Sequence, residues 1–584
     1  MFKKKATAII IGLFVSCTIL NAQPGKEQLI DHVNVFIGTD GLGHCFPGAA
    51  LPFGMVQLSP DTELHKKYLN AAGYQYKDSS IIGFSHTHLS GTGPGSMLDI
   101  LVMPSVGKLQ ASSGTAENPD EGFRSRFSKE SEKAHPGYYE VHLDDYDVDA
   151  ALTVTKRCGF HKYKFPESSQ SNIIFDLGHH VFSMGERVLL ADVEVLDDRT
   201  IIGYHLNTGW WAVNRFTYFV AKFSKPFKSF AVSRDDEIYH NRKSISGQAI
   251  KCFLTFDTRE NEEILVKVGI SAVDYDGAMK NLEAEIVDWD FARVKQEAEE
   301  TWENQLSKIE IEGASDDQKT IFYTALYHTC LGPYLFCDVD GRYRSVNWKT
   351  YKDTSYTQYS TFSIWDTYRA THPLFTIIER ERTVDFVKSL LDMRDQQGGK
   401  HLPIWPLGGT ETYCMIGFHA ASIISEAHVK SIKGFNTERA YEALRTQALH
   451  KKYRYLEFYD QYGFIPYDQE HPSIKHETKM MNHWAPGDEV SKTLEYTYDD
   501  FCVAQMARSL NHMEDYEYFT ERSGNYKNLF HPDYGVFAPR KVTMEWNKPF
   551  DPYSYSPGYT EALPIQYACT GVRQTMRSCY LQRG

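Results

Sequence analysis

The sequence lacks the cysteine spacings that mark metal sites and redox motifs. Its ten cysteines stand at positions 17, 45, 158, 252, 330, 337, 414, 502, 569 and 579, and no two of them form a CxxC pair. Paired cysteines at short spacing are what structural zinc sites and thioredoxin-like motifs require. We therefore interpret most of these cysteines as small buried hydrophobic residues.

Basic clusters and long apolar runs are also missing. The chain of 584 residues carries 62 Lys and Arg against 76 Asp and Glu, a formal net charge of −14, and no basic run follows the first few residues. A nucleic-acid partner would need a basic face, so the composition favours a neutral substrate. No segment approaches the ~20 apolar residues of a transmembrane helix. Internal repeats and low-complexity tracts are absent as well.

The N-terminus has the layout of a secretory signal peptide. In MFKKKATAIIIGLFVSCTILNAQ, three lysines precede an apolar run from Ala8 to Leu20 and a small polar end at Asn21 to Gln23. This arrangement predicts cleavage after about residue 22 and export to the periplasm or outer surface. The alternative, a lipid anchor on Cys17, fits less well because Phe14 stands where such signals usually have a small aliphatic residue.

The hydrophobic period changes once along the chain. From about residue 30 to 285, short runs such as TYFVAKF and EILVKVGIS are separated by Gly, Pro, Asn and Asp turns, which predicts a large antiparallel β-sandwich. From DWDFARVKQEAEETWENQLSKI onward, apolar residues recur at three- and four-residue steps. That half of the chain is predicted to be a helical bundle or barrel.

Glycine-rich loops contain the first candidate site residues. His44 lies in GLGHCFPG, and His86 and His88 lie in GFSHTHLSGTGPGS, where permissive backbone can approach a ligand closely. His86 and His88 could instead form a metal pair, but no third or fourth ligand is evident. In the helical half, Asp366 could cap a helix or pair with Arg369.

Several motifs together resemble glycoside hydrolase family 92, the calcium-dependent exo-acting α-mannosidases of Bacteroidetes. They are VNVFIGTDGLGHCFPGAALPFGMVQLSPDT, GYQYKDSSIIGFSHTHLSGTG, YSTFSIWDTYRATHPL, ETYCMIGFHA, VSKTLEYTYDDFCVAQ and RSGNYKNLFHPDYGVFAPR. The resemblance implies a β-sandwich over residues 23–285, a helical linker over 286–312 and an (α/α)6 barrel from 313, with the active site between the domains. It also implies calcium as cofactor, α-mannoside glycans as substrates, and hydrolysis with inversion by two carboxyl groups roughly 6.5–9.5 Å apart.

The same resemblance assigns roles to individual residues. Glu561 in YTEALPIQY matches the general acid, although Ala562 to Ile565 depart from the family's usual Gly-Asn-Ala-Trp. Glu495 is the alternative acid. Trp365 and Asp366 resemble the pair that holds the hydroxyls of the terminal sugar. The remaining predicted substrate-binding residues are His44, His86, His88 and Glu411, and no calcium ligand is assigned.

The segment that carries the family's general base has no counterpart in this sequence. We therefore expect the chain to be truncated or out of frame, with a partial barrel over residues 313–570 and a non-native tail over 571–584. Impaired hydrolysis is the expected consequence, because inversion needs a base on the face opposite the acid. The alternative is a non-catalytic glycan-binding remnant of such an enzyme.

Overall fold

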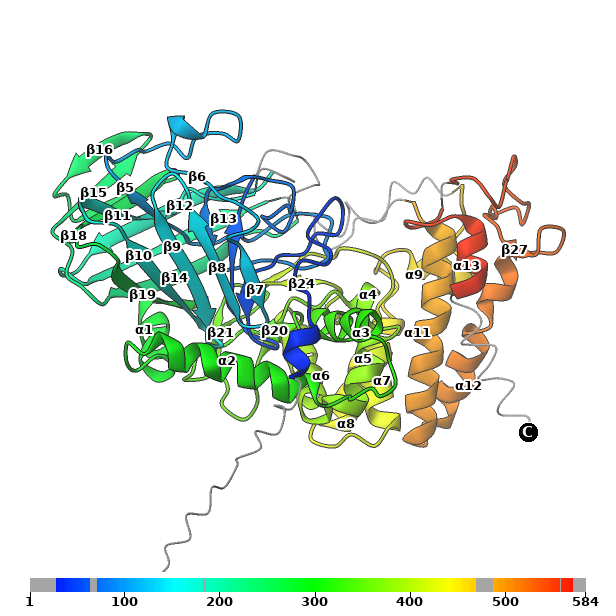
Figure 1. Ribbon diagram of the computed structural model, residues 1–584. Coiled ribbons are helices and arrows are strands. Elements are labelled where there is room, and N and C mark those ends of the chain that lie inside the picture. The colour runs from blue at the N-terminus through cyan, green and yellow to red at the C-terminus, as the bar shows by residue number, and fades with distance from the viewer. Residues whose placement is uncertain are drawn as a thin grey trace, which may run out of the picture.

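The computed structural model describes residues 28–63, 71–181, 185–209, 211–468, 487–556 and 558–570 (Figure 1). The predicted signal peptide (1–22) and the predicted tail (571–584) lie outside these residues.

The N-terminal half folds into two large antiparallel sheets. One sheet has the order β1 (Ala49–Ala50), β2 (Gln57–Asp61), β4 (Gly83–Ser85), β5 (Leu101–Val106), β11 (Ser168–Asp176), β18 (Ile250–Thr258), β15 (Ser229–Arg234) and β16 (Glu237–His240). The other has the order β17 (Ser244–Gly247), β12 (Arg187–Val195), β13 (Thr200–Thr208), β14 (Arg215–Phe223), β19 (Glu262–Ser271), β10 (Cys158–Phe165), β9 (Val148–Val154), β8 (Tyr138–Leu143) and β7 (Lys133–His135). The predicted β-sandwich is confirmed.

Strand β12 shows why these residues form a half-buried strand. Val188, Ala191, Val193 and Val195 are buried, while the residues between them are exposed or half-buried. A register shift between Val188 and Leu190 accounts for the one irregular step in this alternation, because a β-bulge adds a residue to one strand only. The alternation places one face of the strand in the core and the other in solvent.

Two helices connect the sandwich to the helical half: α1 (Tyr275–Glu285) and α2 (Phe291–Leu306). Each starts with an aspartate N-cap, Asp274 and Asp290, whose side chain accepts a backbone N–H of the first turn. Along α2, Phe291, Ala298 and Trp302 are buried on one helical face. The Trp302 indole donates to the Ala50 carbonyl at 2.6 Å, which ties α2 to the sandwich.

The C-terminal half is helical. Its helices are α3 (Asp316–Thr329), α4 (Ile364–Thr367), α5 (Thr371–Ile378), α6 (Arg380–Gln396), α7 (Ala420–Val429), α8 (Thr437–Ala448), α9 (Leu456–Tyr462), α11 (Glu489–Ser509), α12 (Met513–Arg522) and α13 (Pro564–Thr570). Short strand pairs connect them: β20 (Tyr334–Leu335) with β23 (Tyr359–Ser360), β21 (Arg342–Arg344) with β22 (Thr350–Lys352), β24 (Pro406–Leu407) with β25 (Thr410–Glu411), and β26 (Phe530–His531) with β27 (Val536–Phe537). Helix α11 is buried along most of its length and packs against α7, α8 and α12 (Figure 1). A sandwich followed by a helical domain was the predicted fold class, and it is confirmed.

The two halves share one hydrophobic core. Phe53 of the sandwich packs edge-on against Phe375 of α5 at 5.4 Å between ring centroids, and its backbone exchanges hydrogen bonds with Cys330 and Leu335. Trp211 packs edge-on against Trp405 at 4.9 Å. This interface fixes the walls of the cavity described next.

Among the helices in the described ranges, none combines the length and the apolar character that crossing a lipid bilayer requires.

Candidate active site

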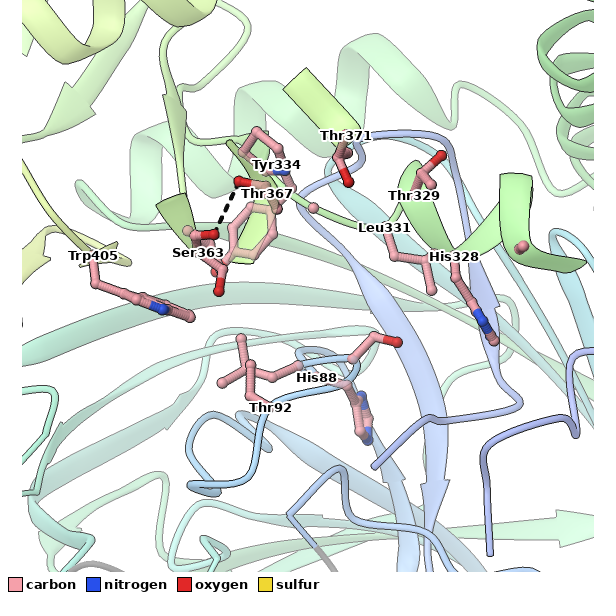
Figure 2. A pocket seen from close by; sticks show the side chains of 16 residues that line it. His88, Thr92, His328, Thr329, Leu331, Tyr334, Ser363, Thr367, Thr371 and Trp405 are labelled. Atoms are coloured by element: carbon pink, nitrogen blue, oxygen red, sulfur yellow. Dashed lines mark hydrogen bonds between the residues drawn. The ribbon is translucent and has the colours of Figure 1, made fainter. Parts of the chain in front are cut away.

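A cavity of ≈ 400 Å³ lies where the sandwich meets the helical domain. The sandwich contributes the loop from His88 to Thr92, and the helical domain contributes parts of α3, α4 and α5, the turn before β20, and Trp405. In Figure 2, Trp405 and Ser363 of the helical domain lie opposite Thr92 of the sandwich loop. The active site was predicted between the two domains, and we take this cavity as the candidate.

The lining of the cavity combines apolar surface with many hydroxyl groups and contains no Asp, Glu, Lys or Arg side chain. Its hydroxyl-bearing residues are Ser90, Thr92, Thr329, Tyr334, Thr361, Ser363, Thr367 and Thr371, joined by the Trp405 indole. The His328 Nε2 is buried and has no hydrogen-bond partner among the described residues, and burial lowers the pKa of this ring. Hydroxyls and one aromatic face suit a neutral ligand that carries many hydroxyl groups.

Asp366 is linked to the cavity wall through Ser363. Ser363 lines the cavity, forms the N-cap of α4, and donates its hydroxyl to the Asp366 carboxylate. Asp366 is exposed, yet desolvation by the surrounding protein raises its pKa. The structure does not pair Asp366 with Arg369, because the Arg369 guanidinium donates to Glu495 at 3.0 Å instead. The neighbouring Trp365 indole N–H is buried without a partner among the described residues.

Glu561 lies in the loop just before α13, outside the cavity lining but near Asp366. Glu561 is exposed, yet desolvation by the surrounding protein raises its pKa, and the negative charges of Asp366 and Asp488 raise it further. Like charges favour the protonated form of a carboxyl group. Glu561 therefore lies within the electrostatic influence of Asp366, and the raised pKa shifts Glu561 toward the protonated form in which a general acid acts.

Glu495, the alternative acid, is held inside α11. One carboxylate oxygen accepts from Tyr368 at 2.8 Å and lies 3.3 Å from the His419 Nε2, while the other accepts from Arg369. His419 also binds Asp499 at 2.7 Å and stacks on Tyr368. Both oxygens of Glu495 are therefore engaged in a buried ion-pair network, a geometry that favours Glu561 as the acid.

The histidines of the HTH motif point into the sandwich. His86 is fully buried, with Nδ1 2.7 Å from the Ile100 carbonyl and Nε2 3.1 Å from the Nε2 of His161, and burial lowers its pKa to about 4. His88 lines the cavity, yet its ring nitrogens contact the Gln57 carbonyl at 2.8 Å and Asp61 at 2.9 Å. Both rings are thus occupied by contacts within the domain.

His44 connects the two glycine-rich loops. Its backbone has a φ of 54°, and its carbonyl accepts the Gly91 N–H at 2.7 Å. The ring is buried, its Nδ1 has no partner among the described residues, and burial lowers its pKa. His44 lies outside the cavity lining, so its visible role is to hold the loop that forms one wall.

Glu411 is buried behind the cavity wall. Its carboxylate accepts the backbone N–H groups of Ile404, Trp405 and Tyr413 at 2.9, 3.1 and 2.7 Å. Burial raises its pKa to about 7 despite these bonds. Glu411 thus fixes the loop that presents Trp405 to the cavity.

Sequence reasoning missed several cavity residues. Two helices contribute His328, Thr329 and Thr371, and the apolar period of a helix indicates only which of its residues are buried. Trp405 stands six positions before the predicted Glu411. These residues meet only through the tertiary fold. A resemblance to the family's motifs around Glu411 was the one signal that pointed near Trp405.

The described residues contain no group of three or more His, Cys, Asp or Glu side chains placed to hold a metal ion. The histidines of the predicted metal pair are bonded elsewhere. We therefore assign no calcium ligand among the described residues and derive no catalytic step through calcium.

Comparisons with known proteins found matches to both halves of the chain. Family models of the glycosyl hydrolase family 92 N-terminal domain and catalytic domain match residues 32–271 and 277–577. The GH92 α-mannosidase BT3965 from Bacteroides thetaiotaomicron, also solved with mannoimidazole, is 38% identical with a TM-score of 0.87, covering 93% of this chain and 71% of that one. The inverting GH92 mannosidase BT2199 from the same species is 25% identical with a TM-score of 0.79, covering 92% of this chain and 70% of that one.

A curated relative, described as an uncharacterized secreted glycosidase of Arthroderma benhamiae, is 27% identical over 583 residues. The match covers 92% of this chain and 66% of that relative, so the chain spans just under two thirds of the relative's length.

Proposed function

Because the chain belongs to glycosyl hydrolase family 92, we propose that it is an exo-acting α-mannosidase that hydrolyses terminal α-mannosides of N-glycans or mannans with inversion. The observation that carries this proposal is the uncharged, hydroxyl-bearing cavity between the domains, whose wall residue Ser363 donates to Asp366. The relatives solved as α-mannosidases support the substrate class.

In this proposal the two carboxyl groups have different tasks. Glu561 carries the proton and gives it to the oxygen of the leaving group, since its neighbours disfavour its ionised form. Asp366, positioned by Ser363, accepts hydrogen bonds from the hydroxyls of the terminal mannose, and Trp365 packs beside them. Inversion also needs a carboxylate that activates water from the opposite face, and we assign no described residue to that task.

Calcium is proposed as cofactor on the family resemblance alone. Calcium prefers six to eight oxygen ligands, and the described residues offer no ready set. Activity that survives exhaustive chelation would contradict the proposal that calcium is the cofactor.

The test is an assay of residues 23–584 with an aryl α-mannoside. We expect low, impaired turnover that is lost on chelation and restored by calcium, and proton NMR should show β-mannose as the first product because the reaction inverts. Release of α-mannose would contradict the inverting mechanism.

A non-catalytic glycan-binding protein is the second candidate, favoured by the absence of an assigned base among the described residues. It predicts no turnover, together with saturable binding of mannoimidazole, the ligand of the BT3965 complex. Binding without turnover would decide for this candidate and against the enzyme.

We also propose export to the periplasm or outer surface, in line with the curated relative described as secreted. N-terminal sequencing of the mature protein should start near Gln23. An intact N-terminus with its three lysines would contradict export.

A further inference from the structure

The segment that carries Glu561 is attached to the first turn of α11. The backbone N–H groups of Val490 and Ser491 both donate to the Gly558 carbonyl, at 3.0 and 3.1 Å. These are N–H groups that a helix cannot satisfy internally, since the first turn has no preceding carbonyls. The first turn of α11 thereby binds Gly558, three residues before Glu561.

The side chain of Ser491 adds a bond closer to the acid. Its hydroxyl oxygen accepts the Thr560 N–H at 2.9 Å, and the residue is fully buried. On the other side of Thr560, the Tyr567 hydroxyl donates to the Thr560 carbonyl at 3.2 Å. Thr560, the residue directly before Glu561, is therefore bonded at both its N–H and its carbonyl.

This anchorage matters because the backbone at Glu561 is strained. Its φ is 49°, in the left-handed region that side chains other than glycine, asparagine and aspartate rarely adopt. Such a conformation persists only where the surroundings impose it. The hydrogen bonds at Gly558 and Thr560 hold this backbone conformation from the N-terminal side. On the C-terminal side, the Leu563 N–H donates to the Gln566 side chain.

We propose that Ser491 is a positioning residue for the general acid: its hydroxyl holds the Thr560 peptide and so aims the Glu561 carboxyl at the leaving-group oxygen. The catalytic part of this inference rests on the proposed function. The positioning part concerns the conformation of residues 558–561 and can be measured without any substrate.

The first experiment measures amide hydrogen exchange in wild type and Ser491→Ala. Losing one hydrogen bond of ordinary strength should speed exchange of the Thr560 amide about fivefold. Ser491→Thr keeps the hydroxyl and should restore slow exchange. If the extra methyl group prevents folding, Ser491→Cys, similar in size but a weak acceptor, should exchange as fast as the alanine variant. Ser509→Ala is the matched control, because Ser509 ends the same helix and bonds His428.

The second experiment measures kinetics on α-mannosides with good and poor leaving groups. A misplaced acid should lower kcat about ten- to a hundredfold on poor leaving groups, while KM stays within about twofold. Unchanged exchange at Thr560 in Ser491→Ala would overturn the inference, as would faster exchange with unchanged kcat. If the wild type turns over no mannoside, the proposed function fails, and the exchange rates alone decide whether Ser491 holds the segment.

Discussion

Replacing Glu561 with glutamine should lower kcat at least about a hundredfold on α-mannosides with poor leaving groups, and much less on activated aryl α-mannosides. General acid catalysis contributes about 10²–10⁴ in rate, and a good leaving group needs little of it. Because the pKa of Glu561 is raised, turnover by the wild type should fall as pH rises through that pKa. The glutamine variant should lack this alkaline limb in a pH–rate profile.

Glu495→Gln is the informative comparison for that experiment. Glu495 is bonded to Tyr368 and Arg369 in a buried network, so its loss should reduce stability and affect both substrate types equally. If Glu561→Gln instead lowers turnover equally on both substrate types, and Glu495→Gln shows the leaving-group dependence, the acid is Glu495.

Replacing Asp99 with alanine should lower the free energy of unfolding by about 3–5 kcal/mol, the usual cost of breaking a buried ion pair on one side. Asp99 is 1% exposed and accepts from Arg215 at 2.7 Å, His205 at 2.6 Å and Thr87 at 2.8 Å. Its removal leaves the Arg215 guanidinium buried without its carboxylate. Unfolding in denaturant measures this loss of free energy of unfolding.

The pH dependence of the Asp99 contribution has a definite sign. Burial opposes ionisation of Asp99, but Arg215 and His205 outweigh burial and hold its pKa below the ordinary value. A carboxylate with a lowered folded-state pKa stabilises the protein above its unfolded pKa and loses that contribution as pH falls. Asp257→Ala is the control, because its ion pair with Lys228 is exposed and should cost less than about 1 kcal/mol. A comparable, small loss for Asp99→Ala would show that the buried network is not needed for stability.

The fold could be predicted from the sequence because the two halves differ in hydrophobic period. Strand β12 alternates between buried and exposed positions, whereas α2 buries Phe291, Ala298 and Trp302 on one helical face. These periods follow directly from strand and helix geometry. How the sandwich and the helices meet does not follow from period, since contacts such as Phe53 with Phe375 join segments far apart in the chain.

The candidate site was only partly predictable for the same reason. Motif resemblance pointed to Glu561 and Asp366, and the charge of Asp366 acts on Glu561. The same kind of resemblance pointed to His86 and Glu411, whose polar atoms are bonded within the protein. A motif shows that residues matter together, but only tertiary structure shows whether a side chain faces a ligand or supports the wall behind it. The hydroxyls of the cavity come from several separate segments and carry no local signal.

The most direct test of the account is calorimetric titration of residues 23–584 with a non-hydrolysable α-thiomannoside, in wild type, Asp366→Asn and Asp257→Asn. Hydrogen bonds to a charged group contribute about 1.5–3 kcal/mol, so Asp366→Asn should weaken binding at least about tenfold. Asp257→Asn, which alters an exposed aspartate of the sandwich, should bind like wild type. Equal affinity in all three proteins would contradict the assignment of the mannoside site to the cavity beside Asp366 and Glu561.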